Sequence, residues 1–98
     1  MKISFIIPVY NDEVSLKKLI ENIKIELKNF TLHFIIIDDC SEDNFESLKS
    51  ISQIDIVTLL KNQGSQKAIS IGLNYTLGEK IDFDYLIVSD GIFSYTKS

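Results

Sequence analysis

The stretch that decides the fold of this chain is Phe34-Ile35-Ile36-Ile37-Asp38-Asp39-Cys40-Ser41-Glu42-Asp43. Its uninterrupted apolar run is typical of a strand that is buried on both faces, as in a parallel sheet. The carboxylates of Asp38 and Asp39 then fall at the carboxyl end of that strand. In open α/β sheets this is the edge at which ligands bind. The stretch therefore predicts an α/β fold and indicates the edge at which a site is expected.

Strand-like and helix-like segments alternate on both sides of this stretch. Apolar, β-rich runs predict strands over Ile3–Ile7, Leu32–Ile37, Ile54–Leu60 and Phe83–Ser89, with Pro8 ending the first. Capping signals predict helices from Asn11 or Asp12 to about Asn29, from the box Asp43–Glu46 to about Ser50, and from Ser65 to Leu77, with Gly78 as a C-cap. The tail from Ile92 to Ser98 shows no clear pattern.

This alternation predicts a parallel sheet with right-handed crossovers. The expected architecture is a three-layer, Rossmann-like α/β fold, in which about four strands in the order 3-2-1-4 carry helices on both faces. The winding direction then reverses between the first and fourth strands, so the switch point lies between the Pro8–Asp12 loop and Asp90. With 98 residues, the chain is expected to form a single domain over residues 1–98.

Charge and cysteine content exclude several classes of function. The net charge is −4 and all ten cationic residues are lysines, so we expect no nucleic-acid partner. Without arginine, a bound diphosphate has to be held by backbone amides, a lysine or a metal. Cys40 is the only cysteine, which excludes an internal disulfide. The amino-terminal apolar run is too short for a signal peptide or a membrane helix, so we expect a cytoplasmic protein without a transmembrane segment.

Two loops that follow predicted strands carry side chains suited to a planar ligand. Tyr10, after the first strand, either stacks on a base or only covers a helix end. Asp38 and Asp39 can accept a hydrogen bond from a base or ribose, or they can help to hold a cation; alternatively, one of them caps the turn with Ser41. Because neighbouring strand residues point to opposite faces, only one carboxylate is expected to face the cleft.

A third loop, Asn62–Ala68, contains Gly64 and Lys67. Glycine lets the backbone approach a ligand closely, and the helix that follows offers free amides to an anion. Gly72, inside that helix, is less favourable than alanine by about 1 kcal/mol, which indicates close packing of the helix on a strand.

Other chemistries are disfavoured by what is missing. His33 is the only histidine, which argues against a metal site built on it, and Cys40 lies beside acids that disfavour a thiolate. Ser41 has no candidate base, so no acyl-transfer triad can be assembled. A phospho-acceptor receiver domain is excluded because Leu60-Lys61-Asn62, after the third strand, lacks the acceptor aspartate.

Four segments together resemble the amino-terminal half of a family-2 glycosyltransferase with the GT-A fold. In chain order they are Phe5–Glu13, similar to the opening strand and its Pro-x-Tyr-Asn loop; Ile36–Asp43, similar to V-D-D-x-S-x-D; Asn62–Gly72, similar to N-x-G-x-x-x-A-x-x-x-G; and Phe83–Asp90, similar to the strand before a metal-binding D-x-D. The resemblance extends over essentially the whole chain to Asp90.

The resemblance implies a nucleotide-diphosphate sugar, of UDP or GDP type, as the ligand. Pro8 and Tyr10 would line the base pocket, with Tyr10 against the ring. Glu13 would lie near the entrance for the sugar nucleotide. Asp39 would bond the base, with Asp38 supporting the site.

On the phosphate side, the resemblance places Gly64 and Lys67 near the ribose and phosphates. Asp90 would be the first D-x-D carboxylate and would help to hold Mg²⁺ or Mn²⁺, which neutralises the leaving diphosphate. The second D-x-D position is Ile92, so the sequence departs from the family there by one carboxylate.

The acceptor-binding half of the family has no counterpart in this sequence, so the expectation is a truncated GT-A domain that supplies donor binding. The implied reaction transfers a sugar to a cell-surface polysaccharide or a lipid carrier, and the isolated chain, which lacks the catalytic base, is expected to be inactive. The alternative is a non-catalytic binding or assembly module that forms a homodimer through the open edge of the fourth strand.

Overall fold

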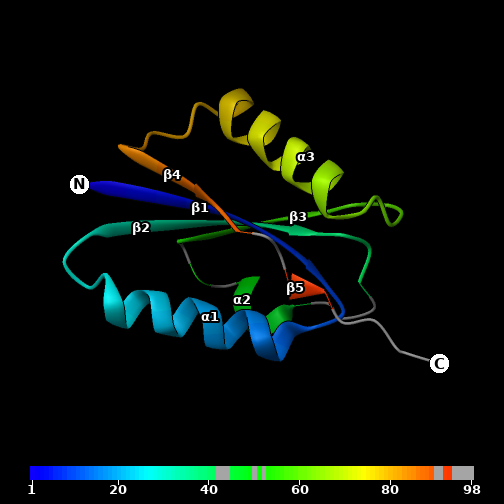
Figure 1. The fold of residues 1–98 in the computed structure, drawn as a ribbon, viewed down its shortest axis with the longest axis horizontal. Coiled ribbons are helices and arrows are strands. Elements are labelled where there is room, and N and C mark those ends of the chain that lie inside the picture. The colour runs from blue at the N-terminus through cyan, green and yellow to red at the C-terminus, as the bar shows by residue number, and fades with distance from the viewer. Residues whose placement is uncertain (42–44, 50, 52, 90–91, 94–98) are drawn as a thin grey trace.

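The computed structural model of the chain describes residues 1–41, 45–49, 51, 53–89 and 92–93. One parallel sheet has helices on either side of it (Figure 1). The strands are β1 (Lys2–Tyr10), β2 (Thr31–Asp38), β3 (Ile54–Thr58), β4 (Tyr85–Val88) and β5 (Ile92–Phe93). The helices are α1 (Glu13–Glu26), α2 (Glu46–Lys49) and α3 (Ser65–Gly78).

The main strands follow the order β3-β2-β1-β4, and all of their pairings are parallel. This confirms the predicted strand order and the Rossmann-like α/β architecture. β1 pairs with β2 from Lys2↔Thr31 to Val9↔Asp38, and Asp38 in turn lies beside Thr58 of β3. The carboxyl ends of β1, β2 and β3 therefore meet at one edge, where the loops with the candidate residues begin.

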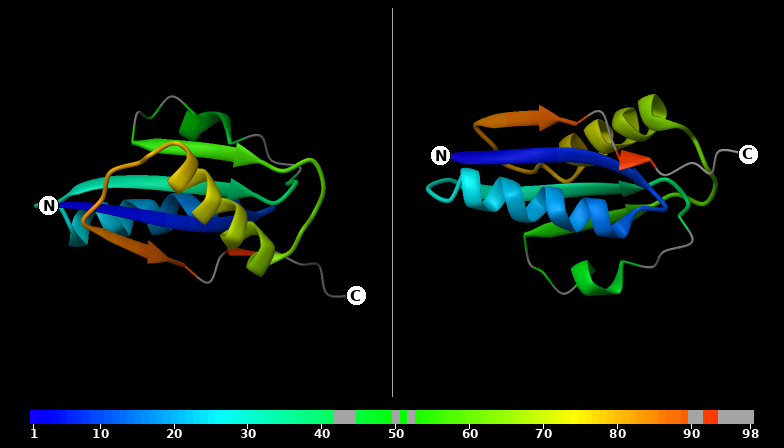
Figure 2. Two further views of the ribbon diagram at one scale, coloured as in Figure 1. Left: turned by 90° about the horizontal axis from the view of Figure 1, so that it is seen from above. Right: turned by 60° about the horizontal axis from the view of Figure 1, so that its bottom comes forward.

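Helices cover both faces of the sheet (Figure 2), and an apolar cluster of side chains fills the space on each side. On one face, α1 and α2 pack on alternate residues of β1 and β2, and the rings of Phe5 and Phe34 stack at 5.3 Å between centroids. On the other face, α3 covers Ile6, Ile35 and Ile37. Because β1 and β2 are buried on both sides, their apolar runs are continuous rather than alternating.

The predicted end of the first strand at Pro8 is wrong, since β1 continues through Pro8 to Tyr10. Proline has no N–H to donate and is normally excluded from a central strand. Here β4 pairs with β1 only as far as Ile6, and β5 takes up the pairing at Val9. Pro8 falls between these two sets of pairs, so the strand tolerates it.

The tail also differs from its prediction. Ile92 and Phe93 form β5, which pairs with Val9 and Tyr10 of β1, although the sequence there shows no strand pattern. β3 ends at Thr58 rather than Leu60, with Leu60 exposed beyond it. β4 spans Tyr85–Val88 rather than Phe83–Ser89.

The helix ends shift by a few residues. α1 ends at Glu26 rather than near Asn29, because Leu27 leaves helical geometry at φ −117° and ψ 37°. α3 includes Gly78, and its C-cap is Glu79, whose N–H donates to the carbonyl of Tyr75. In the predicted capping box of α2, residues 43 and 44 lie outside the described part of the chain. None of the described helices is both long and apolar enough to cross a membrane.

The close helix–strand packing predicted from Gly72 is present. A Cβ at Gly72 would lie 2.6 Å from Ile6 Cγ2 and 3.1 Å from Ile37 Cγ1. Both isoleucines are fully buried in the face that α3 covers. The absent side chain therefore sets how near α3 approaches the sheet.

We expect Gly72→Ala to destabilise the fold by about 1–3 kcal/mol, because overpacking against Ile6 outweighs the better helix propensity of alanine. Gly78→Ala is the matched control in the same helix: nothing lies within 4 Å of its Cβ, so alanine should stabilise by about 0.5–1 kcal/mol. Urea unfolding followed by circular dichroism measures both. Equal midpoints for the two variants would contradict this packing argument.

Candidate functional site

The candidate site is the edge at which β1, β2 and β3 end. Each strand is followed by a residue with positive φ, at Asn11 (54°), Cys40 (63°) and Gly64 (86°). Such values are uncommon for residues other than glycine, so the chain turns tightly in all three loops. Polar contacts between the loops, rather than a shared apolar core, then determine how they sit together.

Asp39 ties the second loop to the third. It is 0% exposed, and its carboxylate accepts the backbone N–H of Gln63 at 2.6 Å and of Gly64 at 2.9 Å. The side-chain amide of Asn62 donates to the Asp39 carbonyl oxygen at 3.4 Å. A buried carboxylate is costly unless it is hydrogen-bonded, and here each oxygen has a backbone donor. Asp39 therefore fixes the turn that begins α3.

Asp38 ties the second loop to the first. Its Oδ1 accepts the N–H of Ser41 at 2.9 Å, and the Ser41 hydroxyl accepts the N–H of Asn11 at 2.8 Å. Asp38 is nearly fully buried at the end of β2. The sequence left open whether these aspartates contact a ligand or whether one of them caps the turn with Ser41. The structure shows that Asp38 caps the turn. Contact of Asp39 with a base stays a prediction.

Two further contacts extend this network on the α1 side. Asp12 caps α1 by accepting the N–H of Ser15, as the sequence predicts. Glu13, in the first turn of α1, accepts the hydroxyl of Ser47 from α2 at 2.6 Å. Sequence reasoning missed Ser47, since nothing in the local pattern indicates that α2 lies beside the start of α1.

The remaining predicted residues lie around the same edge. Pro8 is fully buried in β1, and Tyr10 is half-buried at the end of that strand, beside β5. Gly64 is the N-cap of α3 and supplies no side chain to its free amides, and Lys67 is exposed in the first turn. A helix start with a nearby lysine favours an anion by both its N–H groups and its charge.

Residues 4–91 match the family described as Glycosyl transferase family 2. The chain belongs to this family. The observed sheet and its helices are therefore those of a GT-A-like, Rossmann-type domain.

Related proteins of this family transfer a sugar to a lipid carrier according to their names. The chain is 38% identical over 88 residues to the undecaprenyl-phosphate 4-deoxy-4-formamido-L-arabinose transferase of Yersinia enterocolitica serotype O:8 / biotype 1B (strain NCTC 13174 / 8081). It is 35% identical to the proteins of that name from Yersinia pestis (strain Pestoides F) and Yersinia pseudotuberculosis serotype O:3 (strain YPIII). Each match covers 82% of this chain and 27% of the relative.

The described residues do not test the metal ion expected for this family-2 domain. The expectation rests on Asp90, which lies outside the described part of the chain, and its companion position is Ile92. Within the described residues no group of three or more His, Cys, Asp or Glu side chains is placed to hold an ion. Asp38 and Asp39 already accept backbone N–H groups. The Asp90–metal contact stays a prediction.

The role of Asp39 in this glycosyltransferase domain can be tested by Asp39→Asn. The amide group places an N–H₂ against a backbone donor, so we expect a loss of about 2–3 kcal/mol in the free energy of unfolding. Asp82→Asn is the control, because its exposed ion pair with Lys2 contributes about 0–1 kcal/mol. Chemical denaturation measures both, and an Asp39 variant as stable as the control would refute the assigned role.

Proposed function

We propose that this chain is the donor-binding part of a family-2 glycosyltransferase and binds the nucleotide of a nucleotide-diphosphate sugar. The observation that carries the proposal is the joining of three strand-end loops through Asp38 and Asp39. Loops held together at the carboxyl edge of a parallel sheet form the usual ligand-binding surface of this type of fold. The family supports a sugar nucleotide as the ligand.

In this proposal the base and the phosphates bind at different parts of the edge. Tyr10, at the end of β1, stacks on the base, with Pro8 behind it in the strand. Asp39, although buried, holds the loop around Gly64 that contacts the base. Gly64 and Lys67 then face the ribose and diphosphate. The absence of arginine leaves amides and lysine as the anion-binding groups.

The acceptor follows from the relatives. Their names give undecaprenyl phosphate as the carrier, so a lipid-linked phosphate is the acceptor class that we propose for the reaction. The chain spans about a quarter of the length of these relatives, 27%, and the proposed role is therefore donor binding, with no catalytic residue assigned. A cytoplasmic location is part of the same proposal.

Nucleotide titration followed by amide NMR shifts tests donor binding. We expect UDP or GDP to bind with a Kd of about 1 mM and to shift the amides of Gln63 and Gly64. Lys67→Ala should weaken binding about two- to fivefold through its charge at the helix start, while Lys17→Ala, an exposed lysine of α1, should not. Repeating the titration with Mn²⁺ and with Asp90→Asn tests the metal contact. If neither nucleotide gives a saturable shift at about 10 mM, ten times the expected Kd, the proposal is ruled out.

Self-association through β4 is a second candidate function. In the sheet, β4 is an edge strand, and Tyr85 and Ile87 on it are 57% and 44% exposed. The strand Tyr85–Val88 has neither a charged residue nor a proline, the usual protections against edge pairing. In an antiparallel pairing of two copies about a twofold axis, Leu86 would lie opposite Ile87 and no like charges would meet.

Light scattering across about 10 μM to 1 mM protein measures this association. We expect the apparent mass to rise towards that of a dimer, and Ile87→Lys to abolish the rise by placing a charge in the shared edge. Ile25→Lys is the matched control, because Ile25 is also an exposed isoleucine but lies on α1, away from β4. A monomeric mass throughout the range would exclude the dimer.

A further inference from the structure

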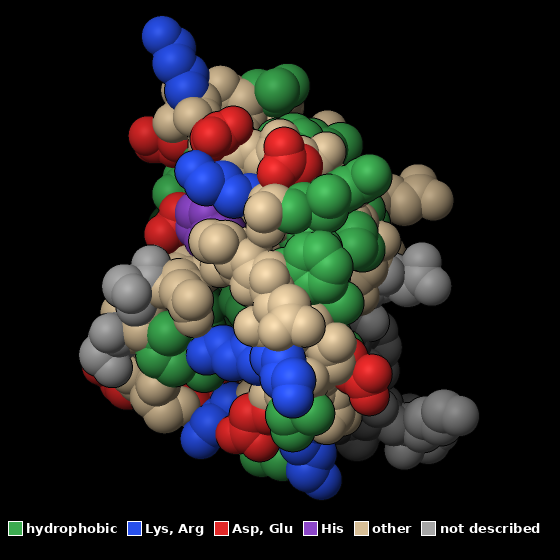
Figure 3. Space-filling view, turned by 90° about the vertical axis from the view of Figure 1, so that its left-hand side faces the viewer, with side chains coloured by type: hydrophobic (Ala, Val, Ile, Leu, Met, Phe, Trp, Pro, Cys, Tyr) green, Lys and Arg blue, Asp and Glu red, His purple; other side chains and the backbone are tan. Residues whose placement is uncertain are grey.

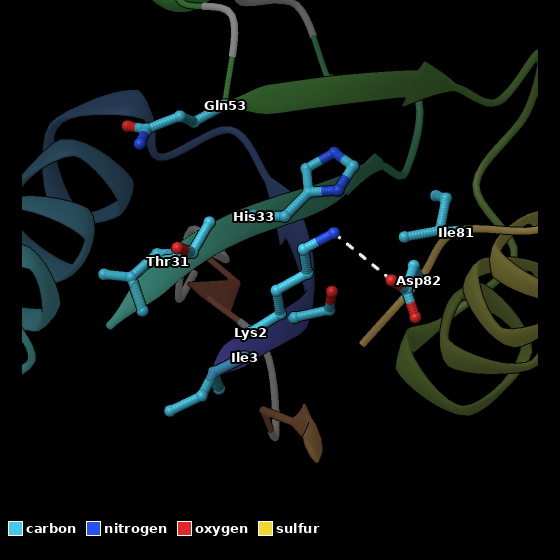
Figure 4. Close-up of a pocket in the computed structure, with 9 residues that line it drawn as sticks. Lys2, Ile3, Thr31, His33, Gln53, Ile81 and Asp82 are labelled. Carbon is cyan, nitrogen blue, oxygen red and sulfur yellow. Dashed lines mark hydrogen bonds and ion pairs between the residues drawn. The ribbon is translucent and has the colours of Figure 1, made fainter. Parts of the chain in front are cut away.

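A cavity lies at the amino edge of the sheet, opposite the nucleotide loops, by which we mean the three loops that follow β1, β2 and β3. It has a volume of about 380 Å³, within the roughly 300–1,000 Å³ range of small-molecule sites. Its polar lining comes from β1, from β2, from the residue before β3 and from the segment after α3, and consists of Lys2, Ser4, Thr31, His33, Gln53 and Asp82. Figure 4 shows the Lys2 side chain reaching toward Asp82, with the ring of His33 nearby.

One lining residue has an unmet hydrogen-bonding group. Ser4 is 1% exposed, and among the described residues its hydroxyl has no hydrogen-bond partner. It lies on the same face of β1 as Lys2 and directly beside His33 of β2. A buried hydroxyl without a partner is unfavourable, and alanine would fill the position without that cost. The hydroxyl is therefore explained better by a ligand than by folding.

Contacts with Asp55, which also bonds Tyr75, hold the His33 side chain of this cavity in place. His33 Nε2 lies 3.2 Å from Asp55 Oδ2, and Tyr75 of α3 donates its hydroxyl to the same oxygen at 3.3 Å. Burial, together with the neighbouring Asp55 carboxylate, raises the pKa of Tyr75, so this donor keeps its proton. With Nε2 engaged, Nδ1 is the ring atom left for a ligand.

The charges of the lining favour neither an anion nor a cation. Among the described residues the lining holds one lysine and one carboxylate, and Lys2 Nζ lies 3.2 Å from Asp82 Oδ2. Figure 3 faces this edge and shows the single histidine close to both lysine and acidic side chains. The hydroxyls of Ser4 and Thr31 each donate and accept, as the amide of Gln53 does. Ile81 adds an apolar wall.

We propose that this cavity binds a small neutral polyol of monosaccharide size. A ligand hydroxyl both donates and accepts at one atom, which matches Ser4, Thr31 and Gln53 without disturbing the Lys2–Asp82 pair. The carbon-bound hydrogens of the ring rest on Ile81. This site is separate from the nucleotide loops and does not depend on the proposed donor binding.

Titration of the full chain with D-glucose, followed by amide NMR shifts, tests the proposal. We expect saturable shifts at Ser4, Thr31 and His33 in the millimolar range and none at Gln63 or Gly64. Sodium acetate and methylammonium chloride are the anion and cation probes, and neither should produce them. Because nucleotides report on Gln63 and Gly64, a failure here and a failure of donor binding are distinguishable.

Two variants make the test specific. Ser4→Ala removes only the unpartnered hydroxyl, so it should fold and weaken glucose binding at least about fivefold. Ser70→Ala, on the exposed side of α3, is the matched control and should bind as the unmodified chain does. The proposal is overturned if glucose gives no saturable shifts, if acetate or methylammonium gives them instead, or if folded Ser4→Ala binds glucose equally well.

Discussion

The buried carboxylate of Asp39 is the interaction on which the candidate site depends. A fully buried charge has to be hydrogen-bonded, and the available donors are the N–H groups of Gln63 and Gly64. Satisfying that charge fixes the loop after β3 against the end of β2. The same loop starts α3, so one electrostatic requirement sets where the helix begins. Asp38 acts in the same way on the first loop through Ser41.

Once α3 begins at that point, packing determines its path. Gly72 lets the helix backbone approach Ile6 and Ile37, and Ala68 is buried in the same layer. The helix then crosses β1 and β2 and carries Tyr75 to the polar pair of His33 and Asp55. The two edges of the sheet are thus connected by one helix, whose start is held by charge and whose middle is held by close contact.

The sequence predicted the strand order because that order follows from alternating strands and helices and from apolar runs that are local in the chain. It misjudged Pro8, because tolerance of proline there depends on a gap between β4 and β5, which are remote in sequence. β5 was missed for the same reason. Motif spacing located Asp38 and Asp39 at the correct edge. Their partners, and the contact of Ser47 with Glu13, depend on loop geometry that no local pattern encodes.

The two edges differ in how their buried polar groups are satisfied. At the carboxyl edge, Asp38 and Asp39 find donors within the protein, and the outcome is a fixed arrangement of loops. At the amino edge, the described residues leave the Ser4 hydroxyl without a partner inside a cavity that His33 and Lys2 also line. Folding stability gives no reason for a hydroxyl at that position, because alanine avoids the unmet hydrogen bond. A ligand hydroxyl, which both donates and accepts, would satisfy the Ser4 hydroxyl. Its binding would leave intact the hydrogen bonds that join the nucleotide loops at the other edge.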